Sequence, residues 1–187
     1  MTEDELIFQL RDRDESAFKE LVYRFQDRIY NTCLGLVQDP NDAEDIAQEV
    51  FIQIYHSIHQ FKGDAQLSTW IYRITVTKSL ELLRSKKRKK RFGFVQSLFG
   101  DNNKPVIEPV NYHHPGIQQE QKEDAALLFK MVDKLPENQR TAFLLNKVEE
   151  LSYREIAAIL NTSESAVDSL LQRAKQNLRK IINNLPP

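Results

Sequence analysis

Apolar residues recur every three or four positions through most of the chain, which is typical of amphipathic helices. In residues 16–37 this spacing predicts one buried stripe, made of Phe18, Leu21, Val22, Phe25, Ile29, Cys33 and Leu36. After a break at residues 38–41 we predict a second helix with Asp42 as its N-cap. Its predicted buried residues are Ala43, Ile46, Ala47, Val50, Phe51, Ile54, Tyr55 and Ile58. No segment alternates with the period of a strand, so the sequence predicts an all-α fold.

Residues 61–91 combine a polar loop, a helix and a run of cations. Gly63 gives the loop access to backbone conformations that other residues avoid. Ser68 or Thr69 is the predicted N-cap of the helix, which carries Trp70, Tyr72 and Arg73 in its first turn. Beyond it lie seven cations interrupted only by Ser85, namely Arg84, Lys86, Lys87, Arg88, Lys89, Lys90 and Arg91.

Aromatic side chains that can stack on bases, beside cations that can follow phosphates, are typical of a surface for single-stranded nucleic acid. Each residue alone has a simpler interpretation, with Trp70 in the core and the others on an ordinary solvated helix. The combination favours nucleic-acid binding.

The helical pattern is interrupted between residues 93 and 117 by Gly93, Gly100, Pro105, Pro109, Pro115 and Gly116. A structureless stretch of this length is unusual inside a compact domain. We therefore interpret residues 93–118 as a flexible linker between two small helical domains, at 1–92 and 119–187. Apolar residues at its start could extend the preceding helix or dock on a partner; they are Phe92, Phe94, Val95, Leu98 and Phe99.

The second domain contains a helix-turn-helix pattern. Ser152 and Glu155 form a capping box that opens a short helix, and after a tight turn Ser163 caps a longer helix. In this arrangement the longer helix is the recognition helix. Its predicted outward residues are Ser165, Asp168, Ser169, Gln172, Arg173 and Lys175. Glutamine and arginine suit adenine and guanine edges, although an ordinary helical hairpin with a polar exterior is the alternative.

Composition and charge narrow the class of protein. Of 187 residues 41% are hydrophobic and 28% charged, as in soluble globular proteins. The acidic N-terminus and the lack of a long apolar run predict a cytoplasmic protein without membrane insertion. Up to Glu49 the chain has 13 acidic and 5 basic residues, although its overall net charge is −1. An acidic N-terminal part and a basic remainder of the chain suggest two partners of opposite charge.

Enzymatic chemistry is the weakest interpretation. The sequence has neither a glycine-rich phosphate loop nor a paired nucleophile and base. Cys33 is the sole cysteine, which excludes an internal disulfide and a cysteine-based zinc cluster. His56 and His59 share a helix but lack a nearby third ligand. We expect no catalytic residues, no metal and no cofactor.

Three motifs in register resemble the bacterial RNA polymerase sigma factors of the extracytoplasmic-function (ECF) class, in the sigma-70 family. They lie at residues 42–51 (DAEDIAQEVF), 67–74 (LSTWIYRI) and 151–157 (LSYREIA). The resemblance covers nearly the whole chain, least so the linker and the first dozen residues. It implies that the N-terminal domain binds the polymerase clamp and melts the minus-ten element. The C-terminal domain would bind the minus-thirty-five element and the polymerase flap. An anti-sigma factor is a further partner that the class suggests.

Carried over by position, the resemblance places Asp45, Gln48 and Glu49 on the clamp. It makes residues 61–68 a pocket for a flipped base, supported by Trp70. With the cations included, the predicted minus-ten residues are Phe61, Lys62, Gln66, Leu67, Ser68, Trp70, Tyr72, Arg73, Thr77, Arg84, Lys86, Lys87 and Arg88.

The chain departs from the family pattern at four positions. Asparagine is common where Thr77 stands, and aspartate or asparagine where Glu81 stands. Basic residues are common at the positions of Asp168 and Leu170. Base preferences therefore do not carry over, and an acidic Asp168 near phosphates should weaken duplex binding by this domain alone.

Two other classes of protein compete with this interpretation. A stand-alone helix-turn-helix regulator would need a dimer interface or an effector pocket, and the sequence shows no sign of either. A structural helical adaptor would not need the Trp70 stretch or the cationic run.

Overall fold

The computed structural model describes residues 1–98 and 127–184, with side chains described for 1–90 and 127–184. The described residues form helices and connecting turns without strands. The helices are α1 (Glu3–Arg11), α2 (Glu15–Val37), α3 (Pro40–Ser57), the 3-10 helix η1 (Ile58–Gln60), α4 (Leu67–Leu98), α6 (Glu137–Lys147), α7 (Tyr153–Leu160) and α8 (Glu164–Asn183). Residues 127–133 are also helical. The all-α prediction is confirmed.

Local capping explains where the first helices begin and end. Thr2 and Glu5 form a capping box at the start of α1, and the Asp14 side chain caps α2. Gln38, in the left-handed conformation with φ 58°, ends α2. The predicted N-cap of α3 was wrong by three residues. Asp39 caps that helix by accepting from the backbone of Asn41 and Asp42, because Pro40 suits the first helical position.

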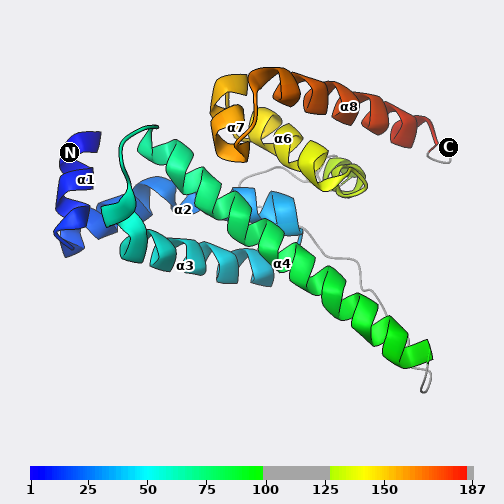
Figure 1. The fold of residues 1–187 in the computed structure, drawn as a ribbon, viewed down its shortest axis with the longest axis horizontal. Helices are drawn as coiled ribbons and strands as arrows, with labels where there is room; N and C mark the ends of the chain where they lie inside the picture. Colours follow the sequence, from blue (N-terminus) through cyan, green and yellow to red (C-terminus); the bar gives the residue numbers. More distant parts are fainter. Residues whose placement is uncertain (99–126, 185–187) are drawn as a thin grey trace.

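Helix α4 is the longest element of the described chain, and in Figure 1 it projects beyond the helices that pack along it. It begins at Leu67, so the predicted N-caps, Ser68 and Thr69, are both wrong: they lie inside the first turn of the helix rather than before it. It runs to Leu98, six residues past the predicted end of the first domain. Residues 99–118 of the predicted linker lie outside the described residues.

The helix-turn-helix prediction is confirmed in its element order and caps. Ser152 accepts from the backbone of Glu155, whose carboxylate accepts from the backbone of Ser152, so the predicted capping box opens α7. Asn161, at φ 51°, ends α7, and the Ser163 hydroxyl accepts from Ala166 N to cap α8. Pro136 precedes α6 at the N-cap position.

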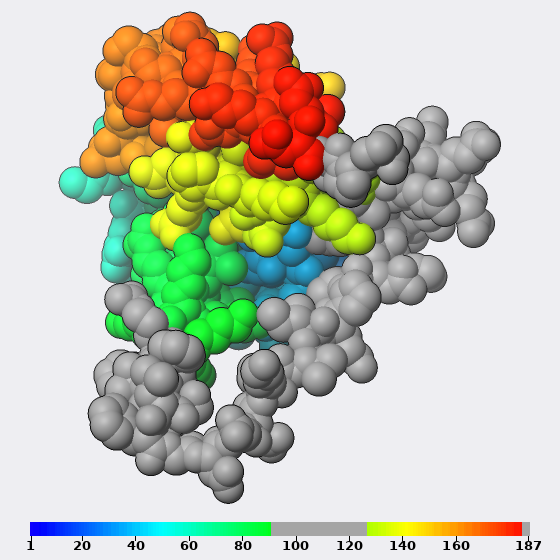
Figure 2. Space-filling view, turned by 90° about the vertical axis from the view of Figure 1, so that its right-hand side faces the viewer, coloured from blue at the N-terminus to red at the C-terminus, as the bar shows by residue number. Residues whose placement is uncertain are grey.

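The two halves of the chain pack against each other through an apolar core. In the space-filling view α6 lies against the N-terminal helices, and α8 lies on the far side of α6 (Figure 2). Leu36, Tyr72, Val76 and Leu80 of the N-terminal half belong to the same buried cluster as the C-terminal core. Gly35 lies at this contact, where a β-carbon would stand at ordinary contact distance, 3.4 Å, from the methyl groups of Leu144.

A second buried cluster forms the core of the N-terminal half. It includes Leu6 and Leu10 of α1, Ile29 and Cys33 of α2, and Ile46, Val50 and Ile54 of α3. Most of the predicted stripe residues are buried or partly buried. Tyr55 is the exception: it is 36% exposed on the outer face of α3, next to Ile52. The Arg13 guanidinium lies 5.7 Å from the centre of its ring.

Candidate nucleic-acid interface

The loop that joins η1 to α4 shapes one side of a hollow. Gly63 adopts φ +81° with open space around the position of its missing β-carbon, so the turn depends on glycine for its conformation rather than for close packing. Phe61 before the turn and Leu67 after it are buried. The exposed residues between them therefore bulge outward from two fixed points.

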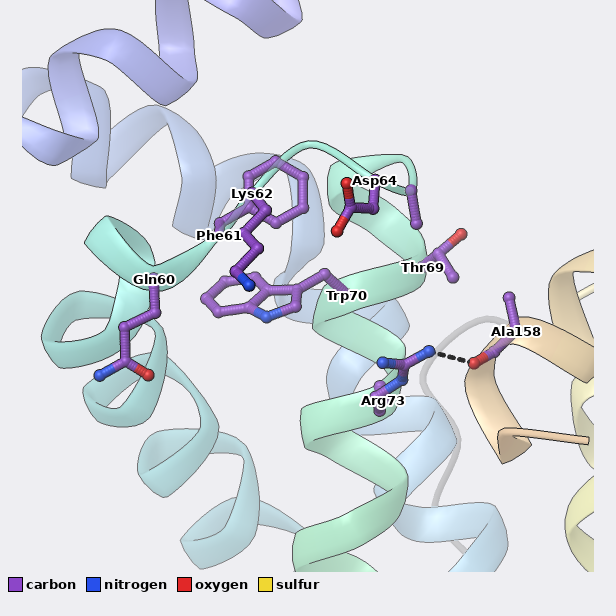
Figure 3. Close-up of a pocket in the computed structure, with 9 residues that line it drawn as sticks. Gln60, Phe61, Lys62, Asp64, Thr69, Trp70, Arg73 and Ala158 are labelled. Carbon is purple, nitrogen blue, oxygen red and sulfur yellow. Dashed lines mark hydrogen bonds between the residues drawn. The ribbon is translucent and has the colours of Figure 1, made fainter.

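A cavity of about 340 Å³ opens between this loop and the first turns of α4. Its lining residues are Gln60, Phe61, Lys62, Asp64, Ala65, Thr69, Trp70, Arg73 and Ala158 (Figure 3). The rings of Phe61 and Trp70 lie against each other with centroids 5.4 Å apart and planes inclined by 49°. An aromatic wall with cations at its rim can hold a planar base by stacking and the attached phosphates by charge.

The predicted minus-ten residues divide by exposure. Lys62, Gln66, Arg73, Thr77, Arg84, Lys86, Lys87 and Arg88 are exposed, and Ser68 and Trp70 are partly so. The side chains of Phe61, Leu67 and Tyr72 are buried, so in this conformation they do not meet solvent. Phe61 and Leu67 instead support the walls and ends of the loop. Their contacts with DNA stay a prediction.

Tyr72 is buried because the C-terminal half covers it. It is 2% exposed, and its hydroxyl donates a hydrogen bond of 2.6 Å to Glu149 Oε2. Burial, followed by this bond to a carboxylate, raises the pKa of Tyr72 above its ordinary value. The hydroxyl is therefore neutral and held as a donor.

Two arginines of α4 also contact the C-terminal half. Arg73 donates to the backbone carbonyl of Ala158 in α7, as the dashed line in Figure 3 shows. Arg84 donates to Glu137 Oε1 at 2.8 Å, and Lys87 lies 3.9 Å from the other oxygen of that carboxylate.

A second cavity, of about 390 Å³, lies between α4 and the helix-turn-helix elements. It is lined by Val76, Thr77, Leu80, Arg84, Asn138, Ile159, Leu160, Asn161, Thr162 and Leu170.

The three predicted clamp residues share the outer surface of α3. Asp45, Gln48 and Glu49 are all exposed. Glu49 pairs with Lys78 of α4 at 3.2 Å, a bridge that was not predicted from the sequence because the partners lie 29 residues apart. Ile52, one turn further along, is 57% exposed, so this acidic surface continues into an apolar one.

The outward face of α8 carries the predicted recognition residues. Ser165, Ser169, Gln172, Arg173 and Lys175 are exposed, while Asp168 is partly buried. The Gln172 amide donates to Asp168 Oδ2 at 2.8 Å, which holds that side chain along the helix surface. Ser169 Oγ donates to the carbonyl of Ser165. The carboxylate of Asp168 is thus directed along the helix rather than outward.

Comparisons with known proteins address both halves of the chain. The family model for sigma-70 region 2 matches residues 21–89, and the model for sigma-70 region 4 matches residues 125–178. The ECF RNA polymerase sigma factor SigW of Bacillus subtilis is 30% identical over 186 residues, covering 96% of each chain. This chain belongs to the ECF RNA polymerase sigma factors.

Other relatives of this ECF sigma factor agree in sequence and fold. The ECF RNA polymerase sigma-E factor of Escherichia coli K12 is 29% identical over 176 residues, covering 94% of this chain and 92% of its own. Among solved structures, CnrH in complex with the cytosolic domain of CnrY has a TM-score of 0.71 at 20% identity and covers 97% of both chains. The sigma factor RpoE of Bartonella quintana, in complex with the anti-sigma factor NepR, has a TM-score of 0.61 at 20% identity, covering 90% of this chain and 98% of its own.

The family matches cover both halves of the chain, whereas a stand-alone helix-turn-helix regulator would not require the N-terminal one. The sigma region 2 match contains the loop, Trp70 and the residues predicted to contact the clamp, and the region 4 match contains α6, α7 and most of α8. Within the described residues, no three potential metal ligands of the His, Cys, Asp or Glu type gather at one place. None of the helices described there has both the length and the apolarity that a bilayer crossing requires.

The contacts between the two halves of this sigma factor were not predicted from the sequence. Glu149, Glu137 and the carbonyl of Ala158 contact α4 from positions 53 to 85 residues away. No local pattern marks such partners. The start of helix α1 could have been predicted from the sequence, since Thr2 and Glu5 have the same capping-box spacing as Ser152 and Glu155.

Proposed function

We propose that this ECF sigma factor directs core RNA polymerase to promoters by capturing the minus-ten strand at residues 61–73 and reading the minus-thirty-five duplex with α8. The observation that carries the proposal is the aromatic-walled cavity beside a strongly cationic α4, on the same chain as a helix-turn-helix. Trp70, supported from behind by the ring of Phe61, provides a stacking surface, and Lys62 provides a cation at the rim.

Free-energy magnitudes support a role as a subunit rather than as a melting protein by itself. Opening a base-pair step costs about 1.4 kcal/mol on average. Stacking one base on an aromatic side chain returns roughly 1–3 kcal/mol. One such cavity offsets one or two steps and not a whole transcription bubble. The polymerase must stabilise the remainder.

The proposed polymerase contacts lie on both domains. Asp45, Gln48 and Glu49 form an exposed acidic and polar surface on α3, which suits a cationic partner such as the clamp. The C-terminal domain would contact the flap. The protein would accordingly work in the cytoplasm, where the polymerase and the chromosome are.

The packing of the two halves bears on how DNA could be bound. Tyr72 can reach a base only if the C-terminal half moves away, since Glu149 and the shared core cover it. We therefore propose that the units 1–92 and 119–187 separate on the polymerase, with residues 93–118 as the connection. An anti-sigma factor is the partner class that would hold them in an inactive arrangement, since the RpoE structure was solved with one.

Strand opening by holoenzyme with Trp70→Ala tests this proposal. We expect the variant holoenzyme to bind promoter DNA but to leave the minus-ten thymines unreactive to permanganate. Melting curves of the free variant establish that the domain still folds, because Trp70 packs on Phe61. Normal thymine reactivity in a folded variant would refute the role of the cavity in melting.

A further inference from the structure

Helix α1 contacts both ends of the loop that borders the cavity. The Arg11 Nη2 donates a hydrogen bond of 2.5 Å to the carbonyl oxygen of Phe61, where the loop begins. The Glu3 Oε1 accepts a hydrogen bond of 3.2 Å from the backbone nitrogen of Leu67, where the loop ends and α4 starts. One short helix thus spans the two points between which residues 62–66 bulge outward.

The bracing helix is itself firmly placed. Leu6 and Leu10 are buried in the N-terminal core, with 1% and 4% of their surfaces exposed. The capping box of Thr2 and Glu5 fixes its first turn. Arg24 of α2 donates a further hydrogen bond of 2.8 Å to the carbonyl oxygen of Met1. Because α1 is anchored at its start and along its buried side, Glu3 and Arg11 hold the loop against a fixed support.

Each of the two hydrogen bonds satisfies a backbone group, at one end of the loop, that has no partner within a helix. The first N–H groups of a helix have no partner within it and carry partial positive charge. The first turn of α4 has no acidic residue of its own, so Glu3 supplies the negative charge from another helix. At the other end, the carbonyl of Phe61 lies outside any helix, and the Arg11 guanidinium donates to it. Hydrogen bonds to charged groups are stronger than those between neutral groups.

We propose that Arg11 and Glu3 are positioning residues for base capture: by pinning both ends of residues 61–67, they hold the loop open at the width that accepts a flipped base. This inference rests on the proposed function. It extends the functional unit to α1, which lies before residue 21, where the sigma-70 region 2 match begins.

The physical advantage is preorganisation. Gly63 gives the exposed part of the loop wide conformational freedom, and a loop that must be ordered at the moment of binding loses affinity to that ordering. Two charge-assisted hydrogen bonds order it beforehand. Breaking one of them lowers the population of the braced loop by roughly tenfold or more.

The test measures how strongly the holoenzyme recognises one base. Abasic sites are placed one at a time along the minus-ten region of the non-template strand, in a promoter found by run-off transcription. Wild-type holoenzyme should show a loss of affinity of roughly 5- to 150-fold at the captured position, the range for stacking one base on an aromatic side chain. In Arg11→Met and Glu3→Gln holoenzymes, we expect this abasic penalty to shrink to less than about 3-fold, because the loop is no longer preorganised.

Matched variants separate positioning from general stability. Asp4→Asn removes a charge from the same turn of α1 as Glu3 and should keep the full abasic penalty. Arg13→Met removes a cation two residues beyond Arg11, on the side of Tyr55, and should keep it as well. Arg11→Lys retains a cationic donor and should restore much of the penalty. Melting temperatures and binding to core polymerase are measured for every variant.

The outcomes are distinguishable. A full abasic penalty in Arg11→Met and Glu3→Gln, with only a lower melting temperature, would mean that α1 supports the fold alone and would overturn the inference. If wild-type holoenzyme shows no sensitive position, base capture by this loop is wrong, and the inference is overturned together with the proposed function. Loss of the penalty in the two variants, with core binding retained, supports it.

Discussion

The hydroxyl of Tyr72 donates a 2.6 Å hydrogen bond to the carboxylate of Glu149, 77 residues further along the chain. It ties the first turns of α4 to the segment between α6 and α7. The same tyrosine ring lies in the apolar core that both halves share. Tyr72 is predicted to contact the minus-ten element. It is therefore hydrogen-bonded to the domain that we expect to read the minus-thirty-five element.

Replacing Tyr72 by phenylalanine should loosen this contact. The ring keeps its packing, but Glu149 loses a hydrogen bond of the kind that contributes roughly 1.5–3 kcal/mol when one partner is charged. Backbone amides of α7 should then exchange with deuterium faster in the free protein. Tyr23→Phe is the control, since Tyr23 is 77% exposed. Equal exchange in both variants would show that the hydroxyl does not hold the halves together.

Charge reversal on α3 should abolish binding to core polymerase. Asp45→Lys with Glu49→Lys places two cations on the proposed clamp surface while leaving the buried face of the helix intact. We expect little change in helicity, since the Glu49 side chain is 63% exposed in its bridge to Lys78 and solvent-exposed ion pairs contribute less than about 1 kcal/mol. Co-purification with core enzyme is the measurement, with Asp27→Lys on α2 as a control. Retained binding would contradict the assignment of this surface.

Substitutions should distinguish the residues that read base edges from those that bind phosphates. Arg173→Ala should weaken binding to the cognate upstream element by roughly 1–3 kcal/mol and affect a scrambled one much less, if Arg173 reaches a base edge. Lys180→Ala, at the far end of α8, is the control. Equal losses on both sequences would mean that Arg173 binds a phosphate, and would make Ser169 and Gln172 the next candidates for base reading.

Neutralising cations of α4 should act without sequence preference. Lys87→Gln with Arg88→Gln should weaken holoenzyme binding similarly on all promoters, because phosphates carry no base information. The dependence of log affinity on log salt should flatten by about 0.7–0.9 for each phosphate that is no longer neutralised. Filter binding over a salt series measures this slope. A weakening confined to one promoter would mean that these residues contribute to specificity.

Stability should fall in alkaline solution through two buried groups. Burial, as the largest cause, raises the pKa of the Cys33 thiol from 9.0 to about 12. The folded protein therefore keeps a proton that the unfolded chain releases. The resulting stabilisation is fully present below pH 9.0 and is lost as pH rises toward about 12. Tyr72 has the same sign, because its pKa is also raised, and its stabilisation starts to decline at the ordinary value of 10.0.

Urea unfolding across this range measures the effect. Cys33→Ala should flatten the decline that begins near pH 9.0, and Tyr72→Phe the decline that begins near 10.0. An unchanged slope in both variants would mean that neither group retains its proton in the folded state.

Local features of this chain could be predicted from the sequence, whereas the relation of its halves could not. The capping box of Ser152 and Glu155 depends on residues three positions apart, so the start of α7 was predicted correctly. The Asp39–Pro40 pair carried an equally local signal, a cap followed by a proline suited to the first helical position. Asp42, the predicted cap, is instead the third residue of the helix. The burial of Tyr72 depends on Glu149 and on residues across the shared core, and no helical periodicity contains that information.

The candidate site shows the same division. Trp70 and the loop were predicted from their chemistry and from the family motif, and the cavity does form between them. The brace from α1 was not predicted, because Arg11 and Glu3 contact positions 50 and 64 residues away. Tyr55 was misplaced for a different reason: it lies at the edge of the apolar stripe, where spacing alone does not distinguish the core from the surface.

The burial of Cys33 has a practical consequence for observing how the halves of this protein move. It is the sole cysteine of the chain and is 0% exposed, with its sulfur closed off from solvent. A maleimide dye would therefore react first with cysteines introduced at the surface. One placed on α3 and another on α8 would report the distance between the two halves by energy transfer. The native chain is in effect ready for such labelling, with no need to replace the residue that fills its core.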